Sequence, residues 1–114
     1  MQAVFIELPA FGWHRDDYFD DESFNRLQIA LMVNPAAGDL IEGTGGLRKL
    51  RFADSRRSKG KRGGLRVIFY YWTAGPEFWL FTVYDKDEMS DLTAKQRTAL
   101  KELVKTELKM RRKS

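Results

Sequence analysis

The sequence of 114 residues contains no cysteine and a single histidine, His14. Without cysteine there can be no disulfide bond, no zinc site built on thiolates and no cysteine nucleophile, and such a chain is consistent with a reducing cytoplasm. One histidine likewise excludes acid–base catalysis by a histidine pair. We therefore expect a cytoplasmic protein whose chemistry relies on other side chains.

Long apolar runs are missing as well. The longest candidates, residues 67–72 and 78–83, have the length of a strand, far below the roughly 20 residues that cross a bilayer. Residues 1–8 have no basic segment and include Glu7, so the sequence predicts no secretory signal peptide. We expect no membrane partner.

The composition, with 43% hydrophobic and 32% charged residues, is that of an ordinary globular protein. A chain of this length can bury one hydrophobic core but not two. We expect residues 1–114 to form a single domain that carries every functional part.

Positive charge is unevenly distributed in this chain of net charge +4. Residues 16–22 are mostly acidic, whereas residues 48–66 hold nine cations and one carboxylate, Asp54. A basic segment of this kind is typical of proteins that bind polyanions. Residues 53–64 lack apolar side chains large enough to pack, so we expect a surface loop that attracts RNA without reading its sequence.

Hydrophobic patterning predicts the elements of the first half of the chain. Residues 3–8 indicate a strand that Pro9 ends. Residues 15–33 are helical, either as one broken helix or as two. The acidic residues that begin at Asp20 suit a helix start, and Pro35 suits the end of the helical region.

The second half indicates three strands and a final helix. The strands are residues 47–52, 65–72 and 78–84, with a hairpin between the last two. The helix starts at Thr93, which with Gln96 forms a capping-box pattern. The order of elements predicts an α+β fold: a twisted, mainly antiparallel sheet of about four strands, with two N-terminal helices and one C-terminal helix against one face.

The alternation of side chains along a strand predicts that several cations share one face of the sheet. In the strand at residues 47–52, Leu50 and Phe52 should share one face, and Lys49 and Arg51 the other. If the three strands are neighbours, the pair Lys49 and Arg51 should meet Arg66 and Lys86 at one end of the sheet. Fixed cations can stabilise the extra negative charge of a pentacovalent phosphorane. A plain phosphate-binding patch without catalysis is the alternative.

Two further patterns bear on ligands. The alternating charges of residues 85–88 could offer carboxylates to a metal but more often form a solvated turn, so we expect no metal and no other cofactor. Tyr70 and Trp72 should share the face of Arg66, where a ring can stack on a base. The residues predicted to bind RNA are Arg48, Arg56, Arg57, Lys59, Lys61, Arg62 and Tyr70.

Three segments together resemble the HigB branch of the RelE/ParE toxin superfamily: Gly-Thr-Gly-Gly-Leu-Arg-Lys-Leu-Arg at residues 43–51, the stretch at residues 60–70, and Tyr-Asp-Lys-Asp-Glu-Met-Ser-Asp-Leu at residues 84–92. Members of this superfamily are toxins of type II toxin-antitoxin systems. The resemblance implies a RelE-like domain that cuts mRNA in the ribosomal A site without a metal, through attack by the ribose 2′-hydroxyl.

The same resemblance assigns the site. It places Lys49, Arg51 and Arg66 at the family's basic strand positions and Lys86 at a position where RelE has arginine. The family's tyrosine near the C-terminus has no evident counterpart, and Tyr84 or Tyr70 could take its place. The catalytic candidates are Lys49, Arg51, Arg66, Lys86 and Tyr84.

The implied partners are an antitoxin with a DNA-binding domain, the ribosome and mRNA. Two other functions stay open at this point: a ParE-like inhibitor that binds DNA gyrase without being an enzyme, and a passive RNA-binding module. The basic strand positions favour cleavage, because a protein-binding inhibitor has no evident need for clustered cations.

Overall fold

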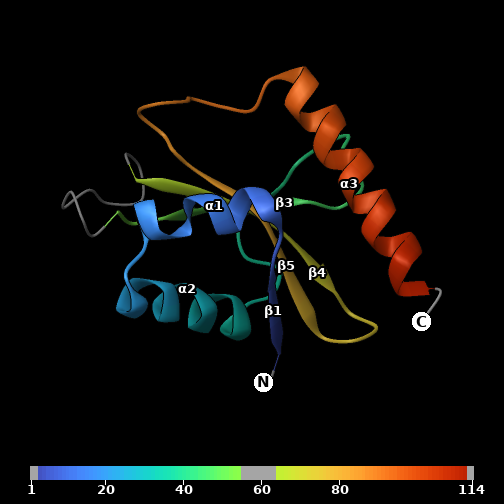
Figure 1. Cartoon of the computed structure of the whole chain (residues 1–114), viewed down its shortest axis with the longest axis horizontal. Helices are drawn as coiled ribbons and strands as arrows, with labels where there is room; N and C mark the ends of the chain where they lie inside the picture. Colours follow the sequence, from blue (N-terminus) through green and yellow to red (C-terminus); the bar gives the residue numbers. More distant parts are fainter. Residues whose placement is uncertain (1–2, 55–63, 113–114) are drawn as a thin grey trace.

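The structure is a computed structural model that describes residues 3–54 and 64–112. It contains three helices and a five-stranded mixed sheet, so the predicted α+β class is confirmed (Figure 1). In chain order the elements are β1 (Val4–Glu7), α1 (Pro9–Tyr18), α2 (Asp21–Val33), β2 (Asp39–Leu40), β3 (Arg48–Phe52), β4 (Leu65–Trp72), β5 (Glu77–Asp85) and α3 (Ala94–Arg112).

The sheet has the strand order β1-β5-β4-β3-β2. Strands β2 to β5 pair antiparallel with their neighbours, and β1 pairs parallel with β5. The predicted four-stranded, mainly antiparallel sheet is therefore wrong in two respects. Strand β2 has only two residues, too few for a period-2 pattern, and the direction of β1 depends on where α1 and α2 return the chain, which its own residues do not record.

The helical region divides into two helices at Asp20. The Asp20 carboxylate accepts a hydrogen bond from the Ser23 amide at 2.7 Å, and the Ser23 hydroxyl accepts one from the Asp20 amide. This capping box begins α2, while α1 begins at Pro9, whose missing N–H is tolerated in a first turn. The predicted helix start at the acidic group is confirmed.

Helix α3 starts where the capping box predicted. The Gln96 amide donates to the Thr93 hydroxyl at 3.1 Å, and the Gln96 side chain accepts from the Thr93 amide at 2.8 Å. In the described part of the chain, no helix is long and apolar enough to cross a membrane.

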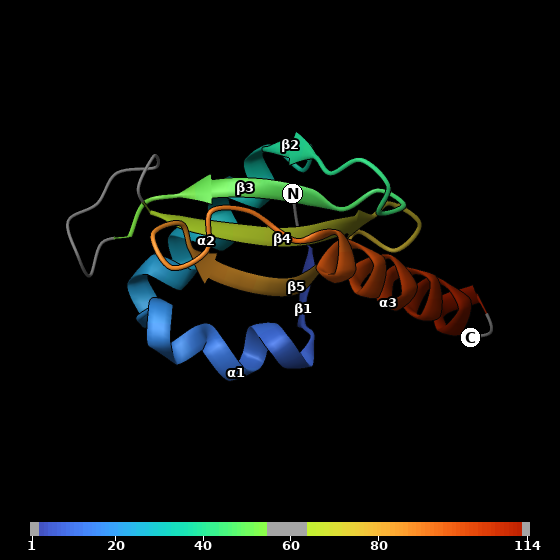
Figure 2. The ribbon, with the colours of Figure 1, turned by 90° about the horizontal axis from the view of Figure 1, so that it is seen from above.

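Helices cover both faces of the sheet, not one face as predicted (Figures 1 and 2). One face, which we call the α1–α2 face, packs against buried residues of α1 and α2. The other, the α3 face, packs against α3. The first core cluster includes Phe11, Phe24, Leu27, Leu31, Val67 and Phe78. The second includes Leu47, Ile68, Trp79, Phe81, Leu100 and Val104.

Candidate functional site

The register of the sheet aligns three polar residues in one row. Arg51 of β3 lies opposite Arg66 of β4, and Arg66 lies opposite Tyr84 of β5. Directly opposite residues point to the same face of a sheet. Arg66 alternates with the buried Val67 of the α1–α2 face, and Tyr84 belongs to the α3 cluster, so the row lies on the α3 face.

Lys49 lies on the same face, two residues before Arg51. Its ammonium donates to the Asp91 carboxylate at 3.3 Å, and the other oxygen of that carboxylate is 3.5 Å from an Arg97 guanidinium nitrogen. The sequence pattern that put Lys49 and Arg51 on one face is confirmed. The carboxylate that holds Lys49 was not foreseen.

Asp91 is fixed by its surroundings. Its side chain accepts a hydrogen bond from the Leu92 amide at 2.8 Å, and this bond, together with the charges of Lys49 and Arg97, holds the pKa of Asp91 below its ordinary value. Asp91 therefore stays ionised at neutral pH and links a strand cation to a helix cation.

Arg97 was not among the predicted site residues, none of which lies on α3. It lies in the first turn of α3, where the helix dipole disfavours a cation. That unfavourable position was a signal in the sequence. A nearby anion offsets this unfavourable interaction, and Asp91 supplies it.

Tyr84 is 6% exposed, and its hydroxyl has no hydrogen-bond partner among the described residues. Burial, followed by the charge of Asp91, raises the pKa of Tyr84 above its ordinary value of about 10, while Arg66 and Arg97 act in the opposite direction. Buried hydroxyls are normally hydrogen-bonded, and this protonated phenol is a donor that lacks an acceptor in the part of the chain that the structure describes.

The two arginines of the row differ in exposure. Arg66 is 4% exposed and donates to the Leu65 carbonyl at 3.1 Å, whereas Arg51 is exposed. One cation is thus held rigidly within the sheet and the other can meet a ligand from solvent.

Lys86 lies in the turn after β5. Its amide donates to the Gly64 carbonyl at 3.0 Å, and its ammonium donates to the Ser90 carbonyl at 3.1 Å, next to Asp91. The Asp85 carboxylate accepts from the Asp87 amide at 2.8 Å. The charged segment at residues 85–88 forms a turn as predicted, but Asp85 is fully buried rather than solvated.

These residues form one group at the end of the α3 face. We call it the basic site, and it consists of Lys49, Arg51, Arg66, Tyr84, Lys86, Asp91 and Arg97. Two hollows open beside it and share Asp39 and Lys49 as lining residues. The larger, about 460 Å³, extends to Arg51, and the smaller, about 160 Å³, extends to Asp91 and Arg97.

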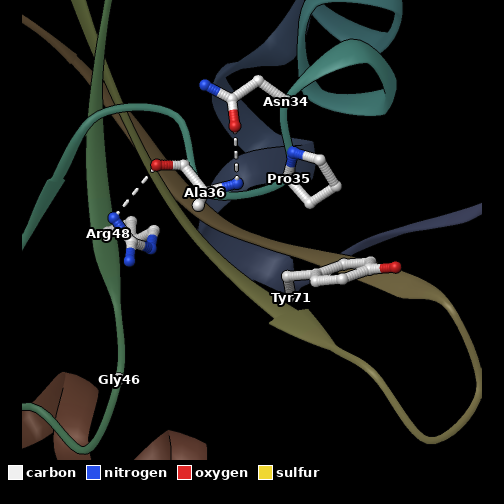
Figure 3. A pocket seen from close by; sticks show the side chains of 6 residues that line it. All are labelled: Asn34, Pro35, Ala36, Gly46, Arg48 and Tyr71. Carbon is white, nitrogen blue, oxygen red and sulfur yellow. Dashed lines mark hydrogen bonds between the residues drawn. The ribbon is translucent and has the colours of Figure 1, made fainter.

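Arg48, a predicted RNA contact, lies on the opposite face. It is paired with Phe69 of the α1–α2 cluster. Its guanidinium donates to the Ala36 carbonyl at 3.1 Å (Figure 3) and to the Gly38 carbonyl at 3.4 Å. It borders a separate hollow of about 350 Å³, with Tyr71 on the other side. Arg48 therefore holds the segment between α2 and β2 and is not part of the basic site.

Tyr70, the other predicted contact, lies on the α3 face but four residues along β4 from Arg66. Its ring stacks on Trp79 with centroids 5.1 Å apart, and the chain at Gly46 lies close to its edge. Four strand residues span about 13 Å, so Tyr70 is separated from the row that contains Tyr84. Of the two tyrosines, only Tyr84 lies in the basic site.

The basic loop cannot be placed in this site, because Arg56, Arg57, Lys59, Lys61 and Arg62 lie outside the described residues. Within residues 3–54 and 64–112, no three His, Cys, Asp or Glu side chains are grouped to hold a metal ion. A scan against models of known protein families finds none that matches this chain.

Proposed function

We propose that this protein is a RelE/HigB-type endoribonuclease that cuts mRNA in the ribosomal A site and so inhibits translation, as the toxin partner of an antitoxin. The observation that supports this function best is the row of Arg51, Arg66 and Tyr84 across three strands, with Lys49 beside it. The proposal thus rests on side chains from different strands that face one surface.

The proposed reaction is transesterification within the RNA. The ribose 2′-oxygen forms a bond to the adjacent phosphorus, the bond from phosphorus to the 5′-oxygen breaks, and a 2′,3′-cyclic phosphate and a 5′-hydroxyl result. The proton lost by the 2′-hydroxyl is balanced by the proton that the leaving 5′-oxygen gains. The intermediate carries one more negative charge than the substrate, and preorganised cations stabilise that charge.

Arg66 and Arg51 suit the non-bridging oxygens of this intermediate. A guanidinium presents several donors in one plane and can hold two oxygens at once. Arg66 is buried and fixed, so little reorganisation is needed as charge develops. Arg51 is exposed and supplies the attraction that brings the phosphate in.

Tyr84 suits the role of hydrogen-bond donor. Its raised pKa keeps the phenol protonated at neutral pH, and its hydroxyl lacks an acceptor among the described residues. Asp91, with its lowered pKa, is a weak proton acceptor and instead holds Lys49 and Arg97 in place. Neither pKa is close to neutral, so positioning and charge stabilisation carry more of the proposed catalysis than proton transfer does.

A ribosome-bound substrate fits the shape of the site. The hollows beside Lys49 are small, so the chain itself offers limited means of fixing the conformation of a flexible RNA. In-line attack requires the 2′-oxygen, the phosphorus and the leaving oxygen to be aligned. The ribosome would hold the mRNA in that geometry, and the basic site would act on it.

The test is induction of the protein in a bacterial host, followed by mapping of mRNA 5′ ends against codon register. We expect cuts in phase with codons, and loss of cuts and of growth inhibition with Arg66→Ala. Arg66→Gln, which keeps most of the volume, guards against a folding defect, and melting temperatures check both variants. A matched control is Arg48→Ala, which removes a cation of the α1–α2 face.

The alternative functions give different results in the same cells. Double-strand DNA breaks without mRNA cuts would indicate gyrase inhibition and overturn the proposal. Salt-sensitive RNA binding without any cleavage would indicate a passive module. Toxicity retained in a folded Arg66→Ala variant would remove Arg66 from the catalytic group.

A further inference from the structure

The smaller hollow lies between β2 and the start of α3. Its lining residues are Asp39, Leu40, Ile41, Glu42, Lys49, Asp91 and Arg97. The last three belong to the basic site, so a ligand in this hollow lies next to any phosphate bound there. A role for the hollow in binding the base that accompanies this phosphate rests on the proposed function.

The hollow is large enough for a single six-membered ring. Its volume is about 160 Å³. A protein cavity of about 150 Å³ accepts benzene, a single six-membered ring. A pyrimidine matches that size, whereas a purine carries a second fused ring.

The lining chemistry differs from that of a phosphate site. Asp39 lies directly opposite Lys49 in the β2–β3 pair, and both Asp39 and Glu42 are exposed carboxylates. Two carboxylates repel phosphate but accept hydrogen bonds from the N–H groups of a base. Carboxylates in nucleic-acid interfaces accept from the amino group of cytosine, and uracil has a carbonyl oxygen at that position.

One of the lining residues, Arg97, has a buried Nε without an acceptor among the described residues. The hydroxyl of Tyr84, in the row of the basic site, also lacks an acceptor among them. The charges of Arg97 and Asp91 act on the Tyr84 phenol, so these groups share one electrostatic environment. The phosphate of a nucleotide whose base lies in the hollow would supply the missing acceptor oxygens.

We propose that this hollow is a base subsite that takes cytosine, the base of the nucleotide whose phosphate binds at the basic site. The cytosine amino group donates to Asp39 or Glu42, and the ring oxygen and nitrogen accept from Lys49 or Arg97. The hollow thereby gives a site of fixed cations a preference for one base.

Binding of free nucleotides tests the subsite without the ribosome. Titration of the protein with cytidine 3′-monophosphate and with uridine 3′-monophosphate should show about tenfold tighter binding of the cytidine compound. The double variant Asp39→Ala, Glu42→Ala should bring that ratio close to one. Both residues are exposed, so stability should change little, which thermal unfolding checks.

Glu102→Ala is the control for the loss of a surface carboxylate. It removes one exposed carboxylate from α3 outside the hollow, so it changes net charge but should keep the cytidine preference. The ratio of affinities is the readout, because removal of negative charge strengthens binding of both nucleotides. Equal affinities in the wild type, or a preference that persists in the double variant, would overturn the subsite.

Cut-site mapping gives the second readout. Wild-type cuts should be enriched in cytosine at one fixed position beside the broken bond, and the double variant should lose this enrichment. Cuts without a cytosine preference would overturn the subsite while leaving the nuclease proposal intact. Absence of all cuts would contradict the proposed function, and the nucleotide ratio would then decide the subsite alone.

Discussion

The two faces of the sheet carry different side chains at the edge where β3 ends and β4 begins. On the α1–α2 face, apolar residues of β3 and β4 continue to the last row, where Phe52 lies opposite Leu65 and the ring centroids of Phe19 and Phe52 are 5.9 Å apart. That row ends on β5 at a single buried carboxylate, Asp85. On the α3 face, the adjacent row holds Arg51 and Arg66. The same strands thus supply a closed core on one side and a polar site on the other.

The difference is visible between neighbours in the sequence. Arg48 and Lys49 are adjacent cations, yet the first holds backbone carbonyls on one face and the second joins the basic site on the other. A basic segment therefore need not act as a unit. Strand alternation decides which of its cations can reach a ligand and which act within the fold.

Under the proposed function, the largest expected difference between the faces is in the rate of mRNA cleavage. Arg51→Ala should slow cleavage about a hundredfold, the effect of removing one charge-stabilising donor, and should leave stability within about 0.5 kcal/mol. Arg48→Ala should do the reverse: cleavage within a few-fold, and stability lower by about 1 kcal/mol for the lost hydrogen bonds. Ribosome cleavage assays and urea unfolding measure the two quantities. Loss of cleavage in folded Arg48→Ala would extend the site to both faces.

The second effect concerns the position of β2. Gly38 has φ +80°, and a Cβ at this position would collide with the Lys49 carbonyl. Gly38→Ala should lower the free energy of unfolding by about 1–3 kcal/mol and should weaken cleavage by moving β2 against Lys49. Urea unfolding and cleavage assays measure both.

Gly43 is the control for this substitution. It has φ +78°, but no atom lies within 4 Å of an added Cβ. Gly43→Ala therefore carries the backbone strain without the collision. Equal losses of stability in the two variants would mean that the close approach to Lys49 is unimportant.

The third effect separates stability from function at Tyr84. Tyr84→Phe removes a buried hydroxyl that has no partner among the described residues, so stability should rise by about 1 kcal/mol while cleavage falls. Tyr71→Phe, on the α1–α2 face, should leave cleavage unchanged. A loss of stability in Tyr84→Phe would show that the hydroxyl has an acceptor.

The same tyrosine has a consequence at alkaline pH. Burial raises the pKa of Tyr84 in the folded protein, so above about pH 10 ionisation of this phenol favours the unfolded state, and stability falls as the pH rises toward the folded value. Tyr84→Phe should therefore lose less stability than the wild type above pH 10. Unfolding measured at increasing pH checks the difference.

The smallest effect is expected at Asp91. The pKa of Asp91 is lowered in the folded protein. Its contribution to stability is therefore present above its ordinary pKa near 3.8, and is lost as the pH falls through the lower pKa of the folded state. The Asp91→Asn variant should be slightly less stable than the wild type at neutral pH. On acidification its free energy of unfolding should fall by less than that of the wild type. Because the side chain is 51% exposed, 1 M salt should reduce the difference further.

Much of the fold could be predicted from local patterns. Both capping boxes, the hairpin before Glu77 and the alternation at Lys49 depend on residues close together in the chain, whose interactions do not require the rest of the fold. The parallel pairing of β1, the short strand β2 and the cover of both faces were not predicted. Each depends on where the chain returns after a helix.

The candidate site, like the fold, could be predicted only in part from local sequence. Local sequence was enough to show that Lys49 and Arg51 share a face and that Arg66 opens the next strand, because side-chain direction in a strand has a period of two. Only the packed fold shows that Tyr84, and not Tyr70, lies in the row. Packing also brings Asp91, which pairs with the nearby Arg97, to Lys49, 42 residues earlier in the chain. Contacts at such separations arise on the α3 face when the helix meets the sheet, and no local pattern encodes them.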